Sequence, residues 1–198
     1  MNTRSLLIIT GLMVAMAFLN GCEIVSFTGQ NPCQGQPAMD LANFKQLTKI
    51  SMETVPPSSE KPGVYPVSIE ETSRGNYLVT NLDENKAKTY MQFCKIGNKE
   101  IMLQGDLDSA GNRTSTFLAI VTKNDGTTFQ AVLAGVDRKA LDASKLQYSI
   151  DDKEYPGTTG PLSVQGTQVH ISNDSDVLAF ANALRVPATD QIIMKLTK

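Results

Sequence analysis

The feature that most constrains this chain is a change in the spacing of its apolar residues near residue 64. From residue 64 to residue 133, apolar and polar residues alternate in short runs that end at turn-forming residues. Alternation with a period of two is typical of β-strands with one buried face. The Asn124-Asp125-Gly126 turn between two such runs is a hairpin signal. The pattern predicts antiparallel strands at residues 64–69, 76–82, 88–96, 100–103, 116–122 and 128–133. Pro66 favours the edge of a sheet for the first of these strands, because proline has no backbone N–H.

Two segments have their apolar residues at helical spacing. Leu41, Phe44, Leu47 and Ile50 recur every three residues, which predicts an amphipathic helix over residues 39–50. Near the C-terminus, residues 173–176 offer several N-caps before an amphipathic helix over residues 177–184.

The remaining elements complete the expected fold. Asp137 is expected to cap a short helical turn at residues 138–143, and residues 155–161 are expected to form a rigid loop. Further strands are expected at residues 146–150, 168–171 and 192–196. The fold class predicted is α+β, mainly antiparallel β in a curved sheet or small barrel, with one N-terminal and one C-terminal amphipathic helix packed on it.

The N-terminus has the parts of an export signal. Arg4 is the only charge before Cys22, and residues 6–19 form an apolar run shorter than the ~20 residues of a spanning helix. The run ends in Leu19-Asn20-Gly21-Cys22, which resembles the lipobox of bacterial lipoproteins, with Asn20 where that family has Ala, Ser or Thr. The resemblance implies a signal peptide at residues 1–21, cleavage between Gly21 and Cys22, and covalent lipid such as palmitate on Cys22. The alternative is a cysteine that merely follows an ordinary signal peptide.

A lipobox sets the location of the whole chain. Each buried CH₂ of the lipid contributes about 0.8 kcal/mol, so release of a chain with two or three acyl groups would be negligible. In the same family pattern, Glu23 favours the outer membrane, facing the periplasm. Residues 22–37 are rich in Gly, Gln and Pro and are expected to be a tether, and residues 38–198 are expected to form a single domain.

Two cysteines, Cys33 and Cys94, remain after acylation of Cys22. In an oxidising compartment an even pair predicts a disulfide, and a closed loop of about sixty residues would contribute roughly 4 kcal/mol. Two buried free thiols, or a reactive Cys94, are the alternatives. Neither cysteine has a CxxC partner, so redox catalysis is not expected.

The sequence offers few groups for catalysis or metal binding. Asp106, Asp108 and Asn112 suggest a calcium loop, but Ala110 and Phe117 occupy places where an EF-hand needs oxygen ligands, so no metal site is expected. His170 is the only histidine, and no nucleophile or zinc motif accompanies it. The methionines that follow the signal are scattered along the chain and do not predict a copper site.

These observations lead to three functional hypotheses. The first is a non-enzymatic binding or accessory module of the cell envelope, with the membrane and an envelope protein as partners and no cofactor besides the lipid on Cys22. The second is a lipocalin-like carrier of a small apolar ligand, because residues 75–141 loosely resemble lipocalin-like and half-barrel domains of bacterial lipoproteins. The third is a hydrolase that uses His170 with Asp174 or Asp176. The formal net charge of −2 argues against a nucleic-acid partner.

Overall fold

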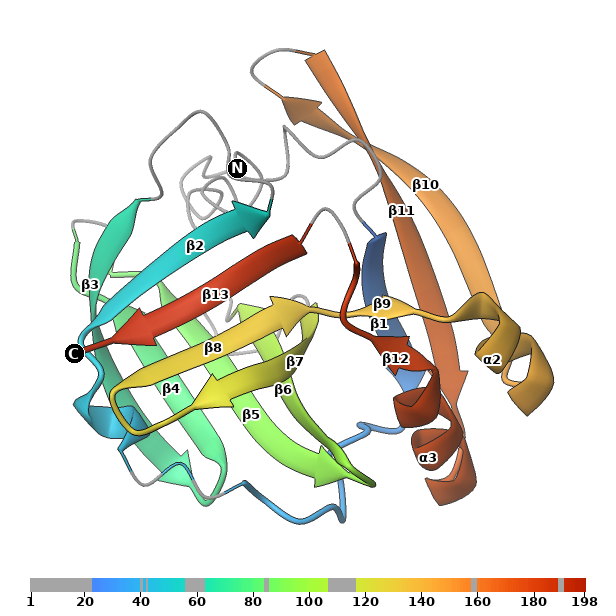
Figure 1. Cartoon of the computed structure of the whole chain (residues 1–198), viewed down its shortest axis with the longest axis horizontal. Helices are drawn as coiled ribbons and strands as arrows, with labels where there is room; N and C mark the ends of the chain where they lie inside the picture. Colours follow the sequence, from blue (N-terminus) through green and yellow to red (C-terminus); the bar gives the residue numbers. More distant parts are fainter. Residues whose placement is uncertain are drawn as a thin grey trace.

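The computed structural model describes residues 23–39, 41, 43–55, 63–83, 86–106, 117–157, 160–188 and 191–198, without side chains at residues 23–24, 106 and 152–165. Its main body is a closed antiparallel barrel of eight strands, lipocalin-like in shape (Figure 1). The last strand closes the barrel because it pairs with both β2 and β8. In their order around the barrel the strands are β13 (Gln191–Thr197), β2 (Lys49–Val55), β3 (Val64–Ser73), β4 (Asn76–Asn81), β5 (Lys88–Ile96), β6 (Lys99–Asp106), β7 (Phe117–Asn124) and β8 (Thr128–Leu133). The structure thus confirms the mainly antiparallel prediction and chooses the barrel over the open sheet.

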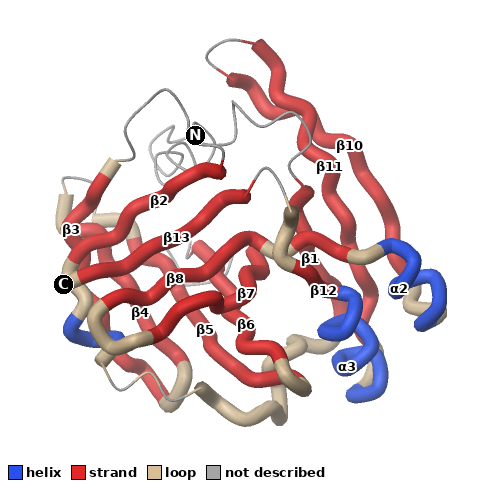
Figure 2. Tube along the Cα trace, in the orientation of Figure 1, coloured by secondary structure: helices blue, strands red, loops and turns tan. Residues whose placement is uncertain are grey.

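A second layer lies beside the barrel (Figure 2). It contains a three-stranded sheet in which β11 (Gly160–Ile171) is central, β1 (Glu23–Gly29) pairs with it in parallel, and β10 (Tyr148–Gly157) pairs with it as a hairpin. Helices α2 (Arg138–Ser144) and α3 (Asp174–Ala183) pack with this sheet, next to a short pair of strands, β9 (Gly135–Val136) and β12 (Leu184–Arg185). The predicted caps are confirmed: the Asp137 carboxylate accepts from two backbone N–H groups of α2, and Asn173 accepts from the N–H of Asp176 in α3.

Strand alternation divides the apolar residues into two cores. On β6, Met102 points into the barrel, while Ile101 and Leu103 point outward into the second layer. Leu118 and Ile120 of β7 point outward in the same way. The second core therefore joins the outer wall of β6 and β7 to the three-stranded sheet and to α3, which makes the second layer part of the domain.

The amphipathic helix predicted over residues 39–50 is wrong. Among the described residues of this segment only a 3₁₀ turn forms, η1 (Phe44–Gln46), and β2 begins at Lys49. Leu41, Phe44 and Leu47 recur every three residues for a different reason. They lie in successive turns in which the N–H of Phe44 donates to the Leu41 carbonyl and the N–H of Leu47 donates to the Phe44 carbonyl, and their buried side chains close one end of the barrel. The ring of Phe44 lies 4.9–5.1 Å from those of Tyr77, Phe93 and Phe129, measured between centroids. We call this the closed end of the barrel.

Two further expectations are corrected by strand pairing. Strand β3 is not an edge strand, because its first residues pair with β2 and its later residues pair with β4. Pro66 lies at the last pair with β2, and its carbonyl accepts from the N–H of Leu82. Residues 155–161 belong largely to the β10–β11 hairpin, in which Pro156 and Pro161 are opposite one another.

Residues 23–37, expected to be a tether, are folded onto the domain. Residues 23–29 form β1, and the Gln30 N–H donates to the Ile171 carbonyl. The chain then reaches Cys33, and the Lys95 N–H donates to the carbonyl of Pro37. In the described part of the chain, no helix is long and apolar enough to cross a membrane.

Candidate functional site

The end of the barrel opposite Phe44 contains an apolar recess. It is lined by side chains that point inward from β2, β6, β7, β8 and β13. Its side chains fill it: the space between them, about 240 Å³ with open solvent included, has no room for even a water molecule, so the recess is not a preformed small-molecule cavity. The larger side chains that line it are Met52, Met102, Phe117, Leu133, Ile192 and Met194. We call this the recess end of the barrel.

The fold brings together methionines that are far apart in the sequence. Met52 and Met194 are direct cross-strand partners on β2 and β13, and Met102 contributes to the same recess from β6. Residues that are scattered along the sequence thus line one recess in the fold. Methionine side chains are flexible and polarizable, so a surface rich in them can rearrange around an apolar guest.

Gln104 is the polar group of the recess. It follows Met102 on the inward face of β6 and is 8% exposed. No hydrogen bond joins its side-chain amide to any other group among the residues that the structure describes. A buried amide without a partner costs about 1–3 kcal/mol, and a ligand that supplies a hydrogen-bonding group would recover that energy.

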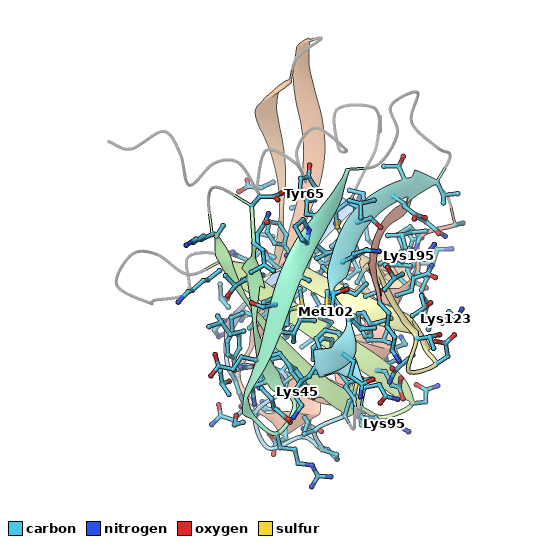
Figure 3. All side chains as sticks on the ribbon, turned by 90° about the vertical axis from the view of Figure 1, so that its left-hand side faces the viewer. Lys45, Tyr65, Lys95, Met102, Lys123 and Lys195 are labelled. Atoms are coloured by element: carbon cyan, nitrogen blue, oxygen red, sulfur yellow. A yellow bond between two sulfur atoms is a disulfide. The ribbon has the colours of Figure 1, made fainter. Side chains whose placement is uncertain are left out.

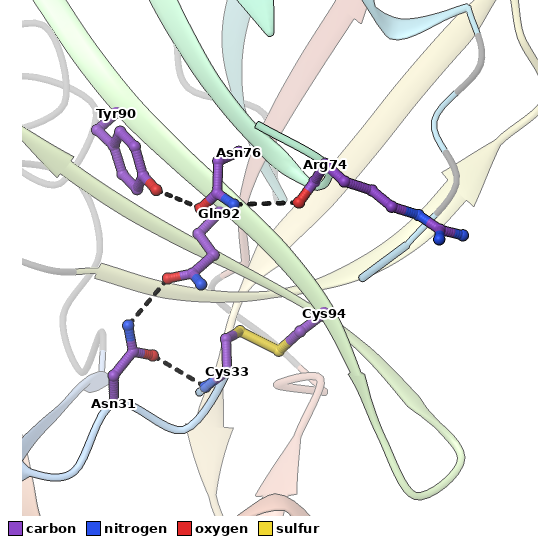
Figure 4. The surroundings of a disulfide bond; sticks show 7 residues. All are labelled: Asn31, Cys33, Arg74, Asn76, Tyr90, Gln92 and Cys94. Atoms are coloured by element: carbon purple, nitrogen blue, oxygen red, sulfur yellow. Dashed lines mark hydrogen bonds between the residues drawn. A yellow bond between two sulfur atoms is a disulfide. The ribbon is translucent and has the colours of Figure 1, made fainter. Parts of the chain in front are cut away.

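The disulfide between Cys33 and Cys94 is confirmed (Figure 4). The two Cα atoms lie 5.5 Å apart, and the bridge joins the segment after β1 to the end of β5. Beside it, the Asn31 side chain donates to Gln92 Oε1 at 2.9 Å and accepts from the Cys33 N–H at 2.9 Å. Because disulfides persist in oxidising compartments, the bridge indicates an extracytoplasmic protein.

His170 lies on the exposed face of the three-stranded sheet. Its neighbours Val169 and Ile171 are buried on the opposite face, and its Nδ1 atom is 3.1 Å from the hydroxyl of Thr28. The two acids proposed as its partners make other contacts: Asp174 accepts from Gln30, and Asp176 accepts from the N–H of Ser172. Neither Asp174 nor Asp176 is therefore hydrogen-bonded to His170, and the hydrolase hypothesis gains no geometric support.

Ionisable groups with shifted pKa values lie away from the recess. Burial lowers the pKa of Lys99, whose Nζ donates to the carbonyls of Ala181 and Leu184 at the end of α3. A hydrogen bond to Asp142 raises the pKa of Tyr148.

The pKa of Asp125 is also shifted. The side chain of Lys123 and the hydroxyl of Thr127, with the N–H groups of Thr127 and Thr128, hold its pKa well below its usual range. These contacts fix the turn between β7 and β8, so the group is structural.

Several expected sites lie outside the described residues. The sequence Leu19-Asn20-Gly21-Cys22 lies there, as does most of the loop from Asp106 to Asn112 that was weighed as a calcium site. Among the residues that are described, no three His, Cys, Asp or Glu side chains form a group that could hold a metal ion.

Sequence reasoning missed the recess and found the disulfide. The sequence pattern predicted a strand that ended at Leu103, one residue before Gln104, whereas β6 continues to Asp106. The usable signal was that Met102 and Gln104 are two residues apart, so a longer strand directs both to one face. No family model matches the chain, and comparisons with curated proteins and with solved structures gave no match.

Proposed function

We propose that this chain is an extracytoplasmic lipoprotein, anchored through acylated Cys22, that acts as a non-enzymatic binding module of the cell envelope. The recess end of the barrel is its proposed binding site. The observation that carries this proposal is Gln104, a nine-tenths-buried amide without a partner among the described residues, surrounded by methionines. Such an arrangement suits an apolar guest with one hydrogen-bonding group.

Two features support this proposal, one the anchor and the other the compartment. The first is the export signal that ends in the lipobox-like Leu19-Asn20-Gly21-Cys22. The second is the disulfide, which supports the extracytoplasmic location because disulfides persist in oxidising compartments. Glu23 supports the outer membrane, facing the periplasm, by resemblance to the lipoprotein pattern.

Metabolic labelling with radioactive palmitate tests the anchor. The parent chain is expected to be labelled, and the Cys22→Ser variant is expected to be unlabelled and either soluble or unprocessed. Labelling of the Cys22→Ser variant would refute the acylation of Cys22.

Photo-crosslinking tests the binding site. A photoreactive phenylalanine analogue replaces Phe117, which lines the recess, and a matched variant carries it at Leu178, which is exposed on α3. In the native envelope we expect a specific adduct from position 117 and none from position 178. Equal adducts at both positions, or none at position 117, would contradict the recess as the site.

Carriage of a small apolar ligand is the second candidate function. The observation that favours it is the closed barrel with methionines at its recess end, and a ligand would enter only if these flexible side chains moved apart, because the recess is filled in this structure. A carrier purified under native conditions should release a stoichiometric apolar compound on extraction with organic solvent. Protein that yields no such compound, and gains no stability from added fatty acids or other apolar compounds, would exclude this candidate and leave the binding module intact.

A further inference from the structure

The position of β1 leaves almost no linker between the proposed anchor and the folded domain. Cys22 directly precedes Glu23, and Glu23 is already paired with Gln165 of β11. The pairing continues without interruption to Gly29. One residue spans at most about 3.6 Å, so acyl groups on Cys22 would hold the domain against the bilayer surface.

Strand direction tells which end of the domain would face that bilayer. Strand β5 runs from Thr89 at the recess end to Cys94 near the closed end, and Cys94 is bonded to Cys33. Because β1 leads toward Cys33, its first residue, Glu23, is directed toward the recess end. In Figure 1, β1 starts on the side of the molecule where β2 ends and β13 begins. The anchor would therefore attach at the recess end.

The same end carries exposed apolar side chains, which we call the rim. They are Val55 at the end of β2, Val64 and Tyr65 at the start of β3, and Leu82 just after β4. Their exposed fractions are 42%, 62%, 40% and 54%, respectively. Figure 3 shows Tyr65 at the end from which the β10–β11 hairpin projects, and Lys45 and Lys95 at the opposite end. Several exposed apolar side chains at one end of a domain can contribute to an interaction surface.

We propose that the rim docks onto the phospholipid bilayer that carries the Cys22 anchor, so that the recess opens toward the lipid. This inference rests on the proposed acylation of Cys22. A protein partner for the rim is the competing occupant, but the absence of a linker brings the bilayer to this end first. Tyrosine favours the boundary between headgroups and acyl chains, and valine and leucine are favourable below it.

The charge of the chain decides which force would hold the rim on the bilayer. The whole chain has a formal net charge of −2, and the export signal that would be removed contains one basic residue, Arg4. Attraction to anionic lipid therefore contributes little, and apolar insertion must supply the contact. Docking is accordingly expected to be insensitive to salt and to the fraction of anionic lipid.

Tryptophan fluorescence tests the proposal directly, because the chain contains no Trp. The acylated Tyr65→Trp variant is reconstituted in phosphatidylcholine vesicles with brominated acyl chains, and flotation verifies that it is anchored. The matched control is Leu178→Trp, because Leu178 is exposed on α3 and packs near Gly97 in the turn at the closed end. Denaturant unfolding of both variants verifies that each is folded.

We expect the emission of the Tyr65→Trp variant to shift to shorter wavelength and lose roughly half of its intensity to the brominated lipid, with no change in the control. Adding Val64→Ser and Leu82→Ser to the Tyr65→Trp variant should remove most of this quenching. Flotation without quenching of the Tyr65→Trp variant, or equal quenching of the control, would overturn the docking and leave the anchor intact. Failure of the parent protein to float would refute the anchor and the docking together.

Discussion

Replacing Gln104 with methionine is expected to stabilise this protein. Gln104 is buried in the recess beside Met102, with no hydrogen bond to its amide among the described residues. Removing the amide recovers a desolvation cost of about 1–3 kcal/mol. Methionine has nearly the same length and volume, so its repacking cost stays below about 1.5 kcal/mol. The free energy of unfolding should therefore rise by about 1–2 kcal/mol.

Urea denaturation of the purified domain measures this change, with the denaturant slope required to stay constant. The matched control is Gln92→Met on β5, because the Gln92 side chain accepts a hydrogen bond of 2.9 Å from Asn31. Breaking that bond should lower the free energy of unfolding by about 0.5–1.5 kcal/mol. If Gln104→Met destabilised the protein as Gln92→Met does, the amide would have a partner in the native state. The assignment of the recess as a binding site would then lose its main support.

Three further predictions concern the closed end, the disulfide and one turn. Phe44→Ala should lower the free energy of unfolding by about 3–5 kcal/mol, since three aromatic rings contact Phe44; a loss below 1 kcal/mol in the same urea assay would show that Phe44 does not close the barrel. Replacing Cys33 and Cys94 together with alanine should cost about 4 kcal/mol for a sequence separation of 61 residues, and equal midpoints for parent and variant without reductant would refute this. Asp125→Ala should destabilise at neutral pH, because the folded-state pKa of Asp125 is depressed below the usual carboxyl value of 3.8. The charged carboxylate thus stabilises the fold above that value, and the difference between variant and parent should shrink as pH falls below it, as acid titrations of unfolding would measure.

Much of the barrel could be predicted from the sequence, because its strands are local hairpins. The run expected at residues 88–96 is β5 to the residue, and the run at residues 128–133 is β8. The caps Asp137 and Asn173 also precede the helices that they were expected to begin. In each case the signal lies within a few neighbouring residues: side-chain alternation, a turn, or an oxygen that accepts from the first turn of a helix.

The binding site could not be predicted in this way, because its parts come from separate strands. Met52 and Met194 become neighbours only when β13 pairs with β2, and Met102 and Gln104 join them only when the barrel closes. Local spacing also gave a wrong prediction of a helix at residues 39–50. There the contacts of Phe44 with aromatic rings on three strands outweigh helical propensity.

The sequence by itself predicted the cysteine pair and the order of the barrel hairpins from β3 to β8. Only the tertiary structure decided that β1 pairs in parallel with β11, about 140 residues later in the chain. Parallel pairing of strands so far apart leaves no mark on local periodicity, because its hydrogen bonds are made by the backbone. That pairing turns an expected tether into part of the fold, and it directs the recess end of the barrel toward the proposed membrane anchor.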